Sequence, residues 1–271
     1  MINIDSEKLI QIVSDAARQE LLPRFTKVSH QFKNDGSIVT EADVITQQRL
    51  AEQLRQNWPD TVLLGEEMSS DEQAAILSSD KPVWCLDPLD GTSNFASGIP
   101  YFAISLSLIS NGNVVIGLVY DPIRNECFFA QDNGENKVTV YLNNTPLIRR
   151  ETSANLSKSI AIIDFKRLSN ELATRIVTER PVSSQRNFGA SALDWCWLAA
   201  GRGQVYLHGN QNLWDYAAGE FIFRASNGIS STLDGEVIYI KTLQKRSVVA
   251  AVNPALFTEW SSWLGIPKPS I

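Results

Sequence analysis

Hydrophobic and polar residues follow one another along this chain with the two periods that are typical of helices and strands. Apolar side chains recur at helical spacing over 6–22, where Asp5 or Ser6 can cap the first turn. The same spacing over 40–58 predicts a second helix, capped by Thr40 or Asp43. Further helices are expected at 168–178, at 191–200 closed by Gly201, from 213 onward, and from Pro254.

Short apolar, β-branched segments lie between these helices. We expect strands at 61–64, 83–86, 101–110, 114–120, 126–130, 159–165, 204–207 and 247–252. Asn111-Gly112 predicts a hairpin turn, and Asp35-Gly36 predicts a turn before the second helix. Aromatic residues on these strands are assigned to core packing: Tyr101, Phe102, Phe128 and Phe129. Alternating strands and helices indicate a mixed α/β protein.

Composition narrows the class of protein. A net charge of -6 and a pI near 5.1 argue against a nucleic-acid-binding surface. No signal peptide is expected from the charged N-terminal residues, and no apolar run is long enough to predict a membrane span. Three widely separated cysteines in apolar surroundings are expected to be reduced and buried, as in a cytoplasmic protein. With two histidines, a zinc site is not expected.

The segment 84–94, with the sequence WCLDPLDGTSN, carries the densest chemistry. An apolar strand is expected to end at Leu86, because Pro88 cannot donate to a sheet and should force a turn. Through such a turn Asp87, Asp90 and the carbonyl of Leu89 can converge, and hard oxygen ligands of this kind suit Mg²⁺. An Asp-Pro turn followed by an Asp-Gly turn, without a site, is the plainer alternative.

A phosphate-binding loop is predicted directly after these acids. Gly91 permits close backbone approach, and Thr92, Ser93 and Asn94 are all good helix caps. A helix that begins here would point free N–H groups at an anion. Metal ligands that lead into a phosphate cradle form the arrangement that phosphoryl transfer requires.

Taken singly, the other acids can be explained by local structure without a functional site. Glu66 follows the strand at 61–64 and could belong to a solvated loop, while Asp43 and Asp215 could simply cap helices. Small residues around Ser191 would let a helix N-terminus approach either a ligand or a packed neighbour.

Taken together, the motifs resemble those of the inositol monophosphatase family of Mg²⁺-dependent, lithium-sensitive phosphatases. The matching elements occur in the family order along nearly the whole chain: 39–43 (VTEAD), 65–67 (GEE), 87–95 (DPLDGTSNF) and 214–219 (WDYAAG). Each element is weak alone, but the four in order are specific, so that Asp43, Glu66 and Asp215 become site candidates.

The resemblance implies a fold and a set of roles. The expected fold is an α-β-α-β-α layered sandwich with an N-terminal α+β lobe (1–145) and a C-terminal α/β lobe (146–271), usually as a homodimer. Two or three Mg²⁺ ions would be held by Glu66, Asp87, the Leu89 carbonyl, Asp90 and Asp215. Asp43 and the Thr92 hydroxyl would polarise the attacking water, with Glu66 as a further catalytic residue.

Substrate contacts are expected from Asp90, Gly91, Thr92, Ser93, Ser191, His208 and Asp215. The segment 206–210 (YLHGN) lacks the acid that many members use to bind substrate hydroxyls. This absence counts against inositol phosphate as the substrate without excluding it. Other sugar phosphates, histidinol phosphate and 3′-phosphoadenosine nucleotides stay open. The segment 225–228 (ASNG) also departs from the family pattern, and Asn227 is expected to adopt the left-handed conformation there.

Two alternatives to this reading are kept. Haloacid-dehalogenase phosphatases use Asp-x-Asp-Gly-Thr with a nucleophilic first Asp, whereas here two residues separate Asp87 from Asp90. A regulatory binding protein could retain the fold without catalysis, although the presence of all the acids argues for an enzyme.

Overall fold

The computed structural model describes residues 4–27, 30–32, 38–134, 138–150 and 155–266. The predicted Asp35-Gly36 turn lies outside these residues. The helices are α1 (Ser6–Ala16), continued by a π-helical turn (Ala17–Leu21), α2 (Glu41–Asn57), α3 (Ser70–Leu77), α4 (Thr92–Ala96), α5 (Asn170–Glu179), α6 (Ser191–Ala199), α7 (Leu213–Ala225) and α8 (Pro254–Leu264). Two 3₁₀ turns, η2 (Leu156–Lys158) and η3 (Phe165–Arg167), flank the strand β10 (Ile160–Asp164).

The strands form two large sheets and a small hairpin. The seven-stranded sheet has the order β3 (Val62–Gly65), β4 (Val83–Asp90), β5 (Ala103–Ser110), β6 (Asn113–Asp121), β7 (Glu126–Gln131), β8 (Val140–Leu142), β9 (Thr145–Pro146). The five-stranded sheet has the order β11 (Ser184–Arg186), β10, β12 (Val205–Gln211), β14 (Arg246–Ala251), β13 (Ile229–Ser231). β1 (His30–Phe32) pairs with β2 (Ile38–Thr40). Parallel pairing joins β3 to β4, and β10 to both β11 and β12.

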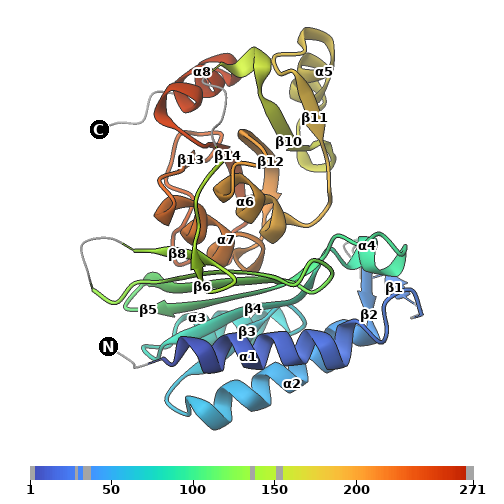
Figure 1. The fold of residues 1–271 in the computed structure, drawn as a ribbon, viewed down its shortest axis with the longest axis vertical. Helices are drawn as coiled ribbons and strands as arrows, with labels where there is room; N and C mark the ends of the chain where they lie inside the picture. The colour runs from blue at the N-terminus through green and yellow to red at the C-terminus, as the bar shows by residue number, and fades with distance from the viewer. Residues whose placement is uncertain (1–3, 28–29, 33–37, 135–137, 151–154, 267–271) are drawn as a thin grey trace.

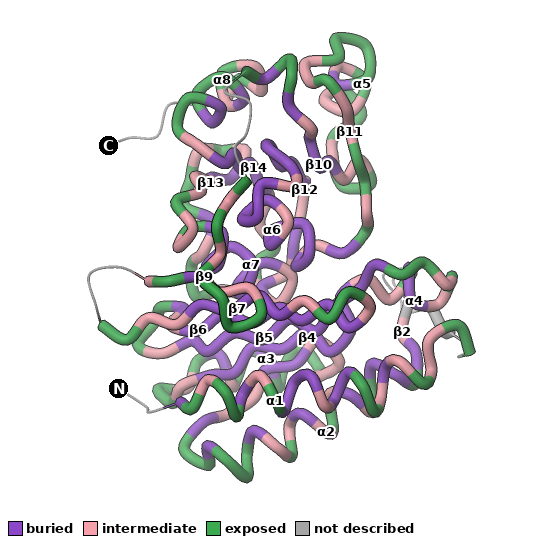
Figure 2. Tube along the Cα trace, in the orientation of Figure 1, coloured by how far each residue is buried: buried purple, intermediate pink, exposed green. Residues whose placement is uncertain are grey.

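Helices and sheets stack in the five layers that the resemblance implies. Helices α1 and α2 cover one face of the seven-stranded sheet, α6 and α7 lie between the two sheets, and α5 and α8 lie on the far side of the five-stranded sheet (Figure 1). Buried residues follow the strands and the two central helices, and the outer sides of α1 and α2 are exposed (Figure 2).

Successive side chains of β5 point to opposite faces of the sheet, so the sheet packs against a hydrophobic core on each face. Ile104, Leu106 and Leu108 are buried against the side of α1 and α2. Side chains between them point to the other face, where Ser105 reaches α7. Helix α7 approaches this face so closely that a Cβ on Gly117 would lie 2.7 Å from the carbonyl oxygen of Ala218. The central helices are therefore held tightly against the sheet that carries most of the acids.

The predicted end of the central strand at Leu86 is wrong. β4 continues to Asp90, and its register against β5 shifts between Asp87 and Asp90. β3 pairs with β4 only as far as Leu86. Pro88 lies beyond this point, so its missing N–H leaves no carbonyl of β3 without a hydrogen bond. The irregularity allows the strand to continue while changing the direction of its side chains.

Two further expectations can be checked against the described residues. Cys85, Cys127 and Cys196 are free and buried, as predicted. Within the described ranges, no helix has the length and apolar character needed to cross a membrane.

Candidate functional site

The end of β4 brings Asp87, Leu89 and Asp90 together. Asp87 is 2% exposed and Asp90 is 8% exposed. The backbone N–H of Leu89 donates to Asp87 Oδ1 at 3.0 Å, so the carboxylate turns back over its own irregular strand end. The two acids thus occupy a buried position at the edge of the sheet that faces α6 and α7.

Asp90 is bonded to the N-terminus of α6, which belongs to the other half of the chain. The N–H of Ser191 donates to Asp90 Oδ1 at 3.2 Å, and that of Ala192 donates to Asp90 Oδ2 at 2.6 Å. The residue before α6 is Ala190, which has no side-chain oxygen to cap the helix, so Asp90 supplies the acceptor from outside. Ser191 therefore reaches Asp90 through its backbone N–H, and its contact with a substrate stays a prediction.

Asp215 lies in the first turn of α7 and is placed by two contacts. Its Oδ2 accepts the N–H of Asn212 at 2.8 Å. The Ser105 hydroxyl donates to the carbonyl of Trp214 at 3.0 Å, and Ser105 is the partner of Asp87 in the β4–β5 ladder. One serine therefore links the strand next to Asp87 with the turn that carries Asp215.

Glu66 follows β3 and runs alongside the end of β4. Its N–H donates to the carbonyl of Leu86 at 3.1 Å, which places it beside Asp87. The amide of Gln73 on α3 donates to the carbonyls of Gly65 and Glu66 at 2.9 and 3.2 Å. Helix α3 was not predicted from the sequence, although Ser69 and Glu72 form the reciprocal capping box that marks a helix start.

Burial and mutual repulsion raise the pKa values of the acids. Burial raises the pKa of Asp87 well above its usual range, and the charges of Glu66, Asp90 and Asp215 raise it further. The pKa of Asp90 is raised mainly by burial and then by Asp215, against the lowering effect of the α6 N–H groups. The pKa of Asp215 is raised by burial and lowered in part by His208, Arg167 and Lys245.

These oxygens have the chemistry of a divalent-cation site. Within the described chain, no Lys, Arg or His forms an ion pair with Asp87, Asp90 or Asp215, so no cationic side chain pairs directly with these acids. Their carboxylates and the Leu89 carbonyl are the hard ligands that Mg²⁺ prefers. In the described ranges, no three His, Cys, Asp or Glu side chains already converge on one point. Asp90 and Asp215 instead accept backbone N–H groups, so cation binding would require these side chains to turn toward a shared ion.

Asp43 and Thr92 form a hydrogen-bonded pair beside this acidic cluster. Thr92 Oγ1 lies 3.1 Å from Asp43 Oδ1 and 3.0 Å from the Leu89 carbonyl, and its single proton can serve only one of them at a time. Asp43 is the third residue of α2 and is 1% exposed. Burial raises its pKa to about 6, although hydrogen bonds from Thr40 and Thr92 favour the charged form. Both residues predicted to cap α2 contribute to its N-terminus: Thr40 is the N-cap, and Asp43 completes the capping box.

Helix α4 begins directly after Asp90, but its cap differs from the prediction. The N-cap is Gly91, at φ 92°, rather than Thr92, Ser93 or Asn94. A Cβ on Gly91 would be strained there and would lie 3.0 Å from the Tyr101 carbonyl oxygen. The first N–H groups of α4 have no partner within the helix, so they are available to an anion.

His208 is buried in the middle of β12 and already has polar partners. It is 5% exposed, its Nε2 lies 3.4 Å from Asp164 Oδ2, and its Nδ1 accepts the N–H of Asn210. His208 still influences the site, since it lowers the pKa of Asp215. Direct contact between His208 and a substrate stays a prediction.

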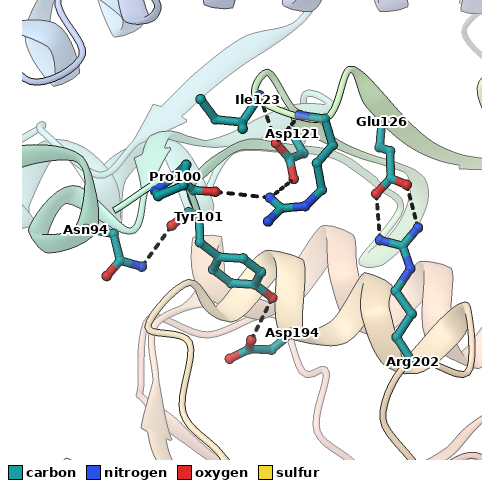
Figure 3. Close-up of polar contacts among 9 residues, drawn as sticks. Asn94, Pro100, Tyr101, Asp121, Ile123, Glu126, Asp194 and Arg202 are labelled. Atoms are coloured by element: carbon teal, nitrogen blue, oxygen red, sulfur yellow. Dashed lines mark hydrogen bonds and ion pairs between the residues drawn. The ribbon is translucent and has the colours of Figure 1, made fainter. Parts of the chain in front are cut away.

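Contacts that the sequence analysis missed join the two halves beside the site. The Asn94 amide donates to the carbonyls of Tyr101 and Phe188 at 2.8 and 2.7 Å. Figure 3 shows the Tyr101 hydroxyl pointing across to Asp194 on α6, at 3.0 Å. Glu126 and Arg202 form an ion pair between the same two parts (Figure 3). Asn94 directly follows the predicted phosphate loop, but nothing in its local sequence identifies carbonyls so distant along the chain as its partners.

Comparison with known proteins gives consistent matches over most of the chain. The model of the inositol monophosphatase family matches residues 2–261. Inositol monophosphatase 1 of Solanum lycopersicum is 33% identical over 261 residues, which cover 92% of each chain. Nus factor SuhB of Pasteurella multocida is 30% identical over 214 residues, covering 77% of this chain and 76% of the relative.

A solved structure agrees with the fold. The inositol monophosphate-bound crystal structure of SaIMPase-II superimposes with a TM-score of 0.77 at 26% sequence identity. The match covers 95% of this chain and 93% of that protein. The five-layered arrangement is therefore shared with an enzyme structure that holds a phosphate ester.

Proposed function

The chain belongs to the inositol monophosphatase family, and on that premise we propose that it is a Mg²⁺-dependent phosphomonoester hydrolase. In this reaction an activated water attacks the phosphorus of a small-molecule phosphate. The observation that carries the proposal is the bond from Ser105, which stands opposite Asp87, to the carbonyl of Trp214, because it links Asp215 of the other half of the chain to the end of β4. Glu66 runs alongside this strand end and α4 begins just after it, so the proposed cation ligands and the proposed anion-binding helix start belong to neighbouring segments.

Two or three Mg²⁺ ions are proposed to bind to Glu66, Asp87, the Leu89 carbonyl, Asp90 and Asp215. Such ions supply Lewis acidity and charge neutralisation for phosphoryl transfer. The chain contributes the fixed positions of these oxygens, through the irregular end of β4 and the Ser105 contact to Trp214. By the family resemblance, we also expect inhibition by lithium.

The phosphate is proposed to rest on the N–H groups of Gly91, Thr92 and Ser93. Thr92 and Asp43 then act on the attacking water. When the Thr92 hydroxyl donates its proton to a hydrogen bond with Asp43 Oδ1, the lone pairs of Thr92 Oγ1 are free to accept a hydrogen bond from that water and polarise it. The carboxylate of Asp43 holds the hydroxyl in this orientation, and burial keeps competing water away from it.

The substrate is proposed to be inositol monophosphate or a related sugar phosphate. A 3′-phosphoadenosine nucleotide and histidinol phosphate are the alternatives within the family. Ser191, His208 and Asp215 border the leaving-group side in this proposal, together with Asp90.

Release of inorganic phosphate from p-nitrophenyl phosphate tests the proposal directly. We expect turnover that depends on Mg²⁺ and falls to background in the Asp90→Asn variant, with secondary structure retained by circular dichroism. Glu171→Gln, which changes an exposed acid in the first turn of α5, is expected to retain Mg²⁺-dependent turnover. A trapped aspartyl-phosphate would contradict the proposal, because an attacking water leaves no phosphoenzyme.

A regulatory role is the second candidate, because several relatives bear the name Nus factor SuhB. Such a role would depend on a binding surface rather than on the Asp90 carboxylate. Wild-type protein that releases no phosphate from any ester with Mg²⁺ present would favour this second role.

We further propose that the protein is a cytoplasmic homodimer in which the lobes 1–145 and 146–271 form one catalytic unit. The reduced, buried cysteines support a cytoplasmic location. The bonds from α6 to Asp90 support a shared catalytic unit. Light scattering coupled to gel filtration tests the dimer, and a mass of one chain contradicts it.

A further inference from the structure

Arg149 joins the ends of three elements of the C-terminal half. It lies in the segment that leaves β9, the last strand of the seven-stranded sheet. Its Nε donates to the carbonyl of Ala199 at 3.2 Å, and its Nη2 donates to the carbonyl and the hydroxyl of Ser226 at 2.5 and 2.8 Å. Nη1 donates to the carbonyl of Val252. Ala199 ends α6, Ser226 is the C-cap of α7, and Val252 follows β14.

The acceptors explain how a half-buried cation is stable here without an acid. Among the described residues, no Asp or Glu forms an ion pair with Arg149. The last carbonyls of a helix lack partners within the helix and carry partial negative charge, so a cation beside them is favourable. The guanidinium also lies over the ring of Phe223 on α7, 5.9 Å from its centroid. Arg149 therefore binds the C-terminal ends of α6 and α7 to each other.

The opposite ends of the same two helices lie at the acidic cluster. The N–H groups of Ser191 and Ala192, at the start of α6, donate to Asp90. Asp215 lies in the first turn of α7. Both helices thus run between the two sheets from the cluster to Arg149 (Figure 1).

The two helices touch between these ends, at Trp195 and Gly219. A Cβ on Gly219 would lie 2.6 Å from the Cβ of Trp195, so the helices cannot approach more closely. On α6 this contact lies four residues after Ser191 and four before Ala199, which is about 6 Å in each direction. A helix can transmit such a displacement as a rigid element. Rotation of α6 about the contact would therefore move its two ends by similar amounts.

We propose that Arg149 is a positioning residue of the metal site. By holding the C-terminal ends of α6 and α7 at one angle, it fixes where the start of α6, which bonds Asp90, lies relative to Asp215. This inference rests on the proposed function, because Asp90 and Asp215 are assigned there to bound Mg²⁺. The acceptors lie on three separate segments, so they require the rigid fork of donors that a guanidinium provides.

Mg²⁺ binding tests the proposed role. R149M retains an unbranched apolar side chain but removes every donor. Calorimetric titration of the folded variant should give a Kd for Mg²⁺ about three- to tenfold higher than that of the wild-type protein, the effect of losing a supporting contact of metal ligands. The kcat at saturating Mg²⁺ should stay close to the wild-type value, because all the proposed ligands are still present.

R175M is the matched control for this variant. Arg175 on α5 also donates to a backbone carbonyl, that of Trp263 at 2.5 Å, and lies over the ring of the same residue. Its helix lies on the far side of the five-stranded sheet (Figure 1). R175M should lose stability without a change in the Kd for Mg²⁺. An equal increase in both variants, or no increase in R149M, would overturn the inference.

Amide hydrogen exchange of the metal-free protein gives a second readout that needs neither Mg²⁺ nor turnover. The amide of Ala192, which donates to Asp90, should exchange about tenfold faster in R149M relative to the amide of Leu106 in β5, which reports global opening. An unchanged ratio of the two rates would contradict the inference. S226A removes one acceptor of the guanidinium and should shift the ratio in the same direction by less. If R149M does not fold, S226A takes its place in both measurements.

These readouts separate this inference from the proposed function. Wild-type protein that binds no Mg²⁺ and hydrolyses no ester would contradict the proposed function, whereas selective exchange at Ala192 in R149M would still show that Arg149 positions α6. Hydrolysis by the wild-type protein, with the Kd for Mg²⁺ and the exchange of Ala192 unchanged in R149M, would contradict this inference alone.

Discussion

The hydroxyl of Ser105 donates a hydrogen bond to the backbone carbonyl of Trp214 at 3.0 Å, across 109 residues of sequence. Ser105 also stands opposite Asp87 in the β4–β5 ladder. A single small side chain therefore sets the distance between the acids of the first sheet and Asp215, which follows Trp214.

We predict that Ser105→Ala weakens Mg²⁺ binding more than it weakens folding. The loss of one buried hydrogen bond should cost about 1 kcal/mol of unfolding free energy. The Mg²⁺ concentration that gives half-maximal activity should rise by roughly three- to tenfold, because supporting contacts of metal ligands have large effects on affinity. Mg²⁺ titrations of phosphatase activity measure this change.

Ser107→Ala is the matched control for this variant. Ser107 lies two residues further along β5, and its buried hydroxyl has no hydrogen-bond partner within the described chain. It should leave the Mg²⁺ dependence unchanged. Equal behaviour of the two variants would show that Ser105 does not position Asp215.

A second prediction concerns the stability of the metal-free protein. The acids repel one another when buried without a cation, so Mg²⁺ should stabilise the folded state. Ligand present at about a hundred times its Kd adds ~2.7 kcal/mol, which corresponds to an increase in Tm of roughly 5–10 °C for a chain of this size. Differential scanning fluorimetry with and without millimolar Mg²⁺, at constant ionic strength, measures it.

Asp87→Asn should raise the Tm of the metal-free protein and reduce the Mg²⁺-dependent increase. The reason is that one of the mutually repelling charges is removed while its position stays filled. Asp60→Asn, at an exposed turn, should do neither. A Mg²⁺-dependent increase that persists undiminished in Asp87→Asn would exclude Asp87 as a ligand.

The local features of this site could be predicted from sequence because they depend on neighbouring residues. Thr40 and Asp43 bond each other within one helical turn. Asn111-Gly112 forms the predicted turn, with φ values of 51° and 77°. Asn227 adopts the left-handed conformation, at φ 64°, as expected from the tolerance of asparagine for it.

Features that depend on distant segments could not be predicted in the same way. Nothing in the sequence around Asp90 indicates that its carboxylate oxygens accept hydrogen bonds from the N-terminus of α6, where Ala192 is 102 residues away. The continuation of β4 through Pro88 depends on where its neighbour β3 ends, which is a property of the sheet. The family resemblance supplied the order of the acids, whereas Ser105 and Asn94 became visible only from the packing of the two halves.

The pKa of Asp43 leads to a third prediction, for the pH dependence of turnover. Because Asp43 must be ionised to accept the Thr92 proton, kcat/KM should rise with pH through about 6, the raised pKa of this carboxyl. The hydroxyl of Thr40 stabilises the charged form from 2.6 Å. Thr40→Ala should therefore raise the pKa of Asp43 and move this limb upward by about one pH unit.

Ser69→Ala controls for the loss of a helix cap. Ser69 and Glu72 form the same kind of capping box on α3, at an exposed position. Both variants should lose about 1 kcal/mol of stability, but only Thr40→Ala should shift the pH profile. An unshifted profile in Thr40→Ala would show that Asp43 does not set the acid limb.

The last prediction concerns Asn94, which joins the segment after the proposed phosphate loop to the segment before α6. Its amide donates to the carbonyls of Tyr101 and Phe188, and the side chain is 8% exposed. Asn94→Asp removes both donors and places a carboxylate against two carbonyl oxygens. We expect a loss of roughly 2–4 kcal/mol in unfolding free energy, because buried acceptors lose their partners and a charge is buried.

Denaturant unfolding compares Asn94→Asp with Asn57→Asp, which removes a similar amide-to-carbonyl bond at the exposed end of α2. The exposed variant should lose less than about 1 kcal/mol, because water replaces the lost bond. Asn94→Asp should also recover stability as the pH falls, since protonation of the new carboxyl restores one donor. If the two variants lose equal stability and show no difference at low pH, Asn94 does not hold the two halves of the site together.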